Sequence, residues 1–424
     1  MKWERSIPFT PEHGAETLAR MPESPGIFLL SSDDPNAEPY INKAANLRRR
    51  LERLLSLASR DSKRLNLGGR TRSIEYTLTG SDFENRFLLY KTLREYFPRS
   101  YRKRMKLIPA PLAKIGWENE YPRAYFTRRS GKTLFSKPEK GLALRETSIY
   151  YGPFASKSGA NKFLNDALDL FKSRRCTFNI HPDPSFPGCI YSEMKMCLAP
   201  CFAGCTKAEY LDEVRRVQDY LDTRAESLIA QLEAEREAAS AALEFEKASA
   251  IHARIDKVKG PWTGVPEIVG RIEQLRAVVV QRSALADHVA LFEFRAGLLH
   301  GPVQLNVAAI QHANPNSGSS SLFSHPHLVG PVPLEGTDTK AAAKKPQTLE
   351  ARVAEALQTV EMRKPERGEA ADHLALLKRW YYRSTKRGEI FLTHSGELPL
   401  RRLVRGISRV FRDERQSGDP SSGK

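Results

Sequence analysis

Three features are scarce in this sequence, and each scarcity excludes a class of protein. No apolar run approaches the roughly 20 residues that a membrane-spanning helix needs, so we expect no membrane segment. The first ten residues, MKWERSIPFT, lack the apolar stretch of a secretory signal, which favours a cytoplasmic protein. Only five of the 424 residues are cysteine, too few for a disulfide-stabilised secreted domain of this length.

Acidic residues are also in deficit. Lys and Arg number 67 against 50 Asp and Glu, which leaves a formal charge of +17 and a pI near 9.6. Such an excess indicates a polyanionic partner; the alternatives are an acidic membrane surface or a composition that is basic throughout. Because the cations cluster in residues 43–53 and 94–106, we expect salt-sensitive DNA binding. The candidate DNA contacts are Arg48, Arg49, Arg53, Arg99, Arg102 and Lys103.

Four of the five cysteines lie within one short segment. Cys176, Cys189, Cys197 and Cys201 have the spacing C-x12-C-x7-C-x3-C, and Cys205 lies outside the pattern. Four thiolates can hold an iron–sulfur cluster or a zinc ion. Zinc sites usually have two short C-x2-4-C pairs, and only the last pair here is that close. A disulfide pair and reduced structural thiols remain alternatives.

The chain divides into segments of different character. Residues 21–108 predict a small α/β domain with a three-stranded sheet, after a weakly ordered lead-in over residues 1–20. Ser81 is the expected N-cap of a helix that runs to about Tyr96. The later segments are a cysteine-rich module at 121–206, a helical region at 207–260, a small β-containing region at 264–310, a linker at 311–348 and a helical region of unknown role at 349–415.

Three sequence elements occur in order within residues 21–260. Gly26-Ile27-Phe28, followed after eleven residues by Tyr40-Ile41-Asn42, is similar to the signature of GIY-YIG endonucleases. The cysteine segment follows Tyr150-Tyr151-Gly152-Pro153-Phe154, and residues 242–255 have the pattern of a helical hairpin. Together these elements resemble the UvrC family, the nuclease subunit of bacterial excinuclease, in which a similar stretch precedes four cysteines and a UVR hairpin pairs with UvrB.

The resemblance implies a nuclease site and also shows where this chain departs from it. Tyr40 matches the tyrosine that activates water, Lys43 the lysine that orients the site, and Arg50 the arginine that neutralises the scissile phosphate. Phe28 and Asn42 replace a tyrosine and a glycine of the motif, and Leu89 replaces the metal-binding glutamate. Since a divalent ion needs a carboxylate anchor, we expect an inactive site. Mg²⁺ or Mn²⁺ would be needed only if it were active.

The resemblance also implies a cofactor and a partner. It favours a 4Fe–4S cluster on the four cysteines, with zinc as the alternative. We expect the hairpin to bind UvrB through an apolar seam formed by Leu243, Phe245, Ala248 and Ile255. The RNase H-type nuclease domain that ends UvrC proteins is expected to be absent, because the sequence after Val307 is linker-rich and poor in acidic residues.

The sequence therefore predicts a UvrC-like nucleotide-excision-repair protein with a degenerate nuclease domain, which binds DNA and UvrB. One alternative is an active endonuclease of single incision, in which another carboxylate replaces the missing glutamate. The other is a regulatory adaptor that competes for UvrB and binds DNA without cutting it.

Overall fold

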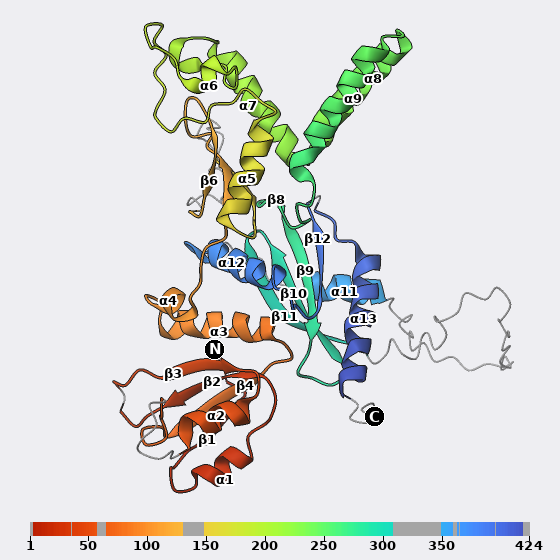
Figure 1. Ribbon diagram of the computed structural model, residues 1–424. Coiled ribbons are helices and arrows are strands. Elements are labelled where there is room, and N and C mark those ends of the chain that lie inside the picture. Colours follow the sequence, from red (N-terminus) through yellow and green to blue (C-terminus); the bar gives the residue numbers. More distant parts are fainter. Residues whose placement is uncertain are drawn as a thin grey trace, which may run out of the picture.

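Among the residues that the structure describes, the strands form three four-stranded sheets, which follow one another along the length of the molecule (Figure 1). The computed structural model describes residues 3–34, 36–56, 65–129, 148–307, 349–358, 363, 365–394 and 396–418. The linker expected at 311–348 lies outside these described residues.

The N-terminal sheet contains the three expected strands and one more. Its order is β1-β4-β2-β3 and all neighbours are antiparallel. The strands are β1 (Arg5–Pro8), β2 (Gly26–Ser31), β3 (Tyr40–Ala44) and β4 (Ser73–Leu78). The expectation of a weakly ordered lead-in is wrong, because β1 pairs with β4 and Phe9 is buried in the core.

Helices cover both faces of this sheet. Alternation along β2 sends Phe28 and Leu30 into a core with Leu51 of one helix, and sends Ile27 into a second core with Phe83 of another. The first face carries α1 (Gly14–Ala19) and α2 (Leu47–Leu55); the second carries α3 (Asp82–Tyr96), which continues into α4 (Tyr101–Met105). Ser81 caps α3 as expected, since its side chain accepts a hydrogen bond from the Glu84 amide.

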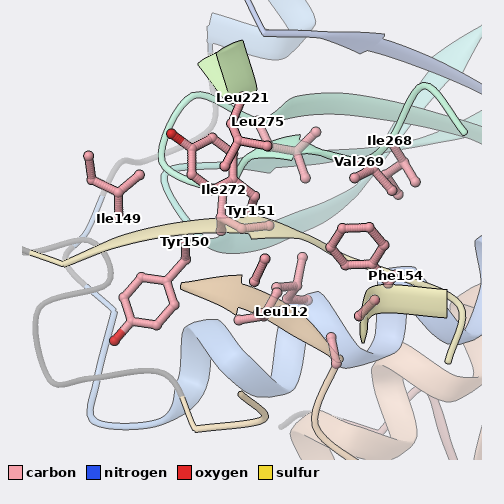
Figure 2. Packing of buried hydrophobic residues seen from close by; sticks show 14 of the residues in the cluster. Leu112, Ile149, Tyr150, Tyr151, Phe154, Leu221, Ile268, Val269, Ile272 and Leu275 are labelled. Carbon is pink, nitrogen blue, oxygen red and sulfur yellow. The ribbon is translucent and has the colours of Figure 1, made fainter. Parts of the chain in front are cut away.

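The second sheet has the order β6-β5-β7-β8 and is antiparallel throughout. Its strands are β5 (Leu112–Ile115), β6 (Ala124–Thr127), β7 (Ile149–Gly152) and β8 (Gly270–Arg271), with α5 (Lys157–Leu168) packed against β5 and β6. Figure 2 shows Tyr151 and Phe154 among Leu221, Ile268 and Val269, which come from distant parts of the sequence. The motif around Tyr150 is therefore core structure.

The cysteine segment and the helical region lie beyond this sheet. The elements are α6 (Ile190–Glu193), η1 (Pro200–Phe202), α7 (Lys207–Asp222), α8 (Glu226–Ala241), α9 (Phe245–Lys259) and η2 (Gly260–Trp262). Helices α8 and α9 form a hairpin that projects away from the sheets (Figure 1). The turn between α8 and α9 comes slightly later than the expected break at Ala239–Ala242. It lies at Leu243, which adopts the left-handed conformation with a φ of 58°.

The third sheet joins the region at 264–310 to the C-terminal region. Its order is β11-β10-β9-β12, with β9 (Arg276–Arg282), β10 (His288–Arg295), β11 (Leu298–Asn306) and β12 (Glu389–Thr393). The segment at 349–415, expected as a helical part of a small α+β C-terminal region, also contains the strand β12, which pairs with β9. The helices there are α11 (Leu349–Gln358), α12 (Glu369–Tyr381) and α13 (Leu400–Gly418).

Strand β9 is buried on both faces, which explains its continuous apolar run. Val278 and Val280 pack with α11 and α13, whereas Ala277 and Val279 face the core shared by α12 and α3. The rings of Phe83 and Phe292 meet edge to face at 5.0 Å, so the helix that covers the N-terminal sheet also packs on the third sheet.

Candidate functional site

The tyrosine and arginine of the nuclease-like motif meet at the edge strand β3. The Tyr40 hydroxyl accepts hydrogen bonds from Asn42 Nδ2 at 2.9 Å and from Arg50 Nη2 at 3.4 Å. Asn46 caps α2 by accepting from the Arg49 amide, and this orients Arg50 toward the strand. Asn42, which replaces the glycine of the motif, thus donates a hydrogen bond to the hydroxyl oxygen of Tyr40.

Phe28 cannot take a chemical role. Its side chain is fully buried, and its ring lies 6.1 Å from that of Tyr40. It contributes packing to the core beneath α2 and offers no hydroxyl to the site.

Lys43 lies on the other side of the strand from Tyr40 and pairs with Asp82 in the first turn of α3. The same carboxylate accepts from Arg86 Nε at 2.7 Å and pairs with Arg383, which lies beyond the end of α12. Burial favours the neutral acid, but the hydrogen bonds from Lys43 and Arg86 outweigh it and hold the pKa of Asp82 well below its usual range. Burial lowers the pKa of Lys43, and the Asp82 carboxylate opposes this shift only partly.

Leu89 is buried among apolar side chains and leaves no carboxylate at the position where the resemblance implies a metal ligand. Asp82 lies seven residues earlier on α3 and is the acid that contacts Lys43. Three cations already neutralise it, so a divalent ion would have to displace them. Across the described ranges, no group of three His, Cys, Asp or Glu side chains could hold a metal ion.

The expected DNA contacts divide into free and engaged cations. Arg49 and Arg53 on α2 are exposed, as are Arg99 and Lys103 at α4. These two pairs lie on opposite sides of the N-terminal sheet, because α2 and α3–α4 cover its opposite faces.

Two other expected contacts are held by the chain itself. Arg48 pairs with Glu23 at 2.6 Å. Arg102 pairs with the buried Asp372 of α12 at 2.9 Å, and 51% of its own side chain is exposed, so its role as a DNA contact stays a prediction.

The four expected cysteines lie near one another in the region of α6 and η1. Burial raises the pKa of Cys197 to about 11, and the charges of Cys176, Cys189 and Cys201 raise it further. The Cys197 sulfur accepts from the Ala199 amide at 3.3 Å. Four neighbouring thiols with an amide donor suit an iron–sulfur or zinc centre in donor chemistry. In the part of the chain that the structure describes, they are not arranged closely enough to hold a metal.

The tip of the α8–α9 hairpin exposes two large apolar side chains. Leu243 is 72% exposed and Phe245 is 65% exposed, while Ala248 is half-buried. Ile255 is only 1% exposed and packs into the core of its own chain near Trp262. The expected seam is therefore corrected: Ile255 lies near the base of the hairpin and is not available to a partner.

The interactions of Asp82 were only partly predictable from sequence. The sequence places Asp82 on nearly the same helical face as Leu89, but about 10 Å along the axis. Its i,i+4 neighbour Arg86 suits an ion pair on one helix. Arg383 is 301 residues away, and no local pattern links it to Asp82.

Comparison with known proteins matches the middle of this chain. Residues 111–220 match the family UvrC/Cho excinuclease, middle domain, and residues 226–260 match the UvrB/uvrC motif. The second match spans both helices of the α8–α9 hairpin.

Curated relatives carry the name UvrABC system protein C. The protein of Rickettsia rickettsii (strain Sheila Smith) is 29% identical over 68% of this chain and 42% of its own length. That of Carboxydothermus hydrogenoformans is 30% identical over 57% of this chain and 37% of its own length. The chain thus spans less than half of these relatives. No solved structure matches it. No helix among the described residues is both long and apolar enough to cross a membrane.

Proposed function

Since this chain is related to the UvrC family through its middle domain and its UVR motif, we propose that it is a nucleotide-excision-repair protein that binds UvrB and DNA without cutting DNA. The UvrB-binding element is the α8–α9 hairpin, and the DNA-binding element is the basic N-terminal domain. The nuclease-like residues Tyr40, Lys43 and Arg50 support the fold or bind phosphate, and they do not cut DNA.

The exposed hairpin tip is the observation that carries this proposal. A soluble helical hairpin normally buries its large apolar residues, yet Leu243 and Phe245 stand in solvent at the turn. Both lie inside the segment that matches the UvrB/uvrC motif. Exposed apolar residues on a projecting helix fit a partner helix that covers them, with Phe245 as the aromatic anchor.

Binding to the C-terminal segment of UvrB tests this proposal. We expect the full chain to bind that segment in a calorimetric titration, and Phe245→Ala to cost about 1–3 kcal/mol of binding free energy. Ile108→Ala is the matched control, because Ile108 is 65% exposed and lies far from the hairpin in sequence. Absence of binding by the unmodified chain would remove the main support for both the repair and the adaptor functions.

The ion pairs of Asp82 support a non-cutting role. An acid held by Lys43, Arg86 and Arg383 is a poor metal ligand, and Leu89 supplies none. We expect no nicking of damaged duplex with Mg²⁺ or Mn²⁺, with or without UvrA and UvrB. The presence of the Asp82 carboxylate beside Lys43 is also the observation that favours the alternative, an active single-incision endonuclease. Metal-dependent cutting that disappears in Tyr40→Phe or Arg50→Ala would establish that alternative.

We further propose that the cysteine module holds a 4Fe–4S cluster, with a four-thiolate zinc ion as the alternative. Support comes from the electrostatic proximity of the four thiols and from the amide that donates to Cys197. Protein purified without oxygen should show broad absorbance near 400 nm. Colourless protein with stoichiometric zinc would favour zinc, and protein with neither metal would exclude the site.

A further inference from the structure

Three cations from three separate segments pair with the single carboxylate of Asp82, and a fourth lies near them. Lys43 comes from β3, Arg86 from α3 and Arg383 from the segment after α12, and each pairs with Asp82. Arg379, in the last turn of α12, lies close enough that the charges of Arg86 and Arg383 lower its pKa after the effect of burial. One carboxylate cannot neutralise four cations, so this cluster retains a strong local positive charge.

The fold holds these segments in place. The Asp372 carboxylate of α12 accepts from the Tyr101 hydroxyl at 2.6 Å and from Arg102 of α4. Glu369, at the start of α12, pairs with Arg94 of α3, and the rings of Phe83 and Trp380 meet at 5.5 Å. The end of α12 is therefore fixed beside the nuclease-like face of the N-terminal domain.

The cluster has room and donors for a further anion. Arg383 is 40% exposed in its side chain, and Arg379 is also exposed. Each guanidinium carries five N–H groups. Among the described contacts, Arg86 directs one nitrogen at Asp82 and Arg383 directs another. The remaining N–H groups match the oxygens of a phosphate, which arginine recognises in a planar, bidentate manner.

We infer that Lys43, Arg86, Arg379 and Arg383 form a composite site for a DNA phosphate, half of it supplied by the C-terminal region, with Asp82 as a built-in counter-ion. This rests on the proposed function in assuming that the chain binds DNA. The region at 349–415 thereby acquires a role that its sequence did not indicate.

The salt dependence of DNA binding tests this site. The full chain would be titrated into fluorescent duplex DNA between low and moderate salt, and log Kd plotted against log salt. Removing one cation that binds a phosphate should reduce the slope by about 1, so the double variant Arg379→Ala/Arg383→Ala should reduce it by about 2. The matched control is Arg401→Ala/Arg402→Ala, two exposed arginines of α13 on the opposite face of the third sheet.

Asp82→Asn provides the opposite change. It removes the counter-ion while keeping the side-chain shape, so DNA binding should become tighter and its salt slope steeper. If the double variant and the control have equal slopes while the unmodified chain binds DNA, this inference is overturned and the proposed function stands.

Two further outcomes separate the alternatives. If the unmodified chain does not bind DNA at any salt concentration, the DNA-binding part of the proposed function fails together with this inference. If the double variant loses affinity for a polyglutamate peptide and not for duplex DNA, the site serves an acidic protein and the DNA inference is overturned.

Discussion

The nuclease-like face and the hairpin tip differ in whether their side chains already have partners within the chain. On the face between β3 and α3, Lys43 and Arg86 are engaged with Asp82, and a C-terminal arginine joins them. At the hairpin tip, Leu243 and Phe245 are exposed among charged neighbours. On the first surface the cations already contact an acid of the same chain, whereas on the second the apolar side chains remain exposed to solvent.

This difference leads to different expectations for the two surfaces. An apolar side chain gains roughly 25 cal/mol for each Å² that a partner covers, so an exposed phenylalanine is a source of binding free energy. An ion pair that is already formed gains little from a new partner unless the partner brings extra charge. We therefore expect the tip to control partner binding, and the face between β3 and α3 to control stability and the response to charge.

The largest expected effect comes from breaking the contact between α12 and α4 that holds the end of α12 beside the face between β3 and α3. Asp372→Ala removes a buried acceptor, 4% exposed, from Tyr101 and Arg102. We expect a loss of about 3 kcal/mol in unfolding free energy, measured by urea denaturation, since breaking a buried pair leaves its partners unsatisfied. Glu23→Ala, which breaks the exposed pair with Arg48, should cost less than about 1 kcal/mol. Equal losses would show that the contacts of Asp372 contribute no more than an exposed ion pair.

The next effect is a pH dependence that arises from Glu84 on α3. Glu84 is 3% exposed, and burial raises its pKa to about 7 from the usual 4.5, although the Gly80 amide donates to it. Between these values the folded state binds more protons than the unfolded state, so this carboxyl makes stability decrease as pH rises from about 4.5 to 7.

Glu84→Gln removes this titration. At pH 8 the variant should be more stable than the unmodified chain by about 2–3 kcal/mol, and the difference should vanish near pH 4. Unfolding free energies of both proteins across this range provide the measurement. A difference that does not change with pH would show that Glu84 titrates normally.

A smaller effect on DNA binding distinguishes the exposed arginines of α2 from Arg102, which is paired with Asp372. Arg49→Glu with Arg53→Glu should weaken DNA binding and reduce the salt slope by about 2, because both side chains are exposed. Arg102→Glu should instead lower the unfolding free energy, because Arg102 holds Asp372. Paired anisotropy and denaturation measurements distinguish the two cases. DNA affinity that is the same at all salt concentrations would exclude the basic-surface hypothesis.

The smallest effect on stability is expected at the hairpin tip. Phe245→Ala and Leu243→Ala should change the unfolding free energy by no more than about 0.5 kcal/mol, because both side chains are exposed. Phe292→Ala, in the fully buried core, should cost about 3–5 kcal/mol. A large loss from the tip variants would mean that the tip packs on its own chain.

Much of the local structure could be predicted from the sequence. The strands at Gly26 and Tyr40, the Ser81 cap and the helices of the hairpin follow from apolar periodicity, capping residues and turn signals, all of which act over a few residues. The UvrC resemblance found in these motifs was confirmed for the middle domain and the UVR motif.

Other expectations failed where distant segments meet. The strand β1 was missed because its pairing partner β4 lies about 70 residues away, as the match of Arg5 with Tyr76 shows. The strand β12 was missed for the same reason, since it pairs with β9. Ile255 fits an exposed apolar seam by helical spacing, and only the packing near Trp262 reveals that it is buried.

The sequence by itself determined which residues carry charge, which thiols are close enough along the chain to share one site, and which side chains line each face of a helix, because these properties depend on composition and local periodicity. The tertiary structure alone decided that Arg383 pairs with Asp82 and that Arg102 holds Asp372. Such contacts join residues hundreds of positions apart, and they form only when the packing of α12 against α3 brings both partners within reach.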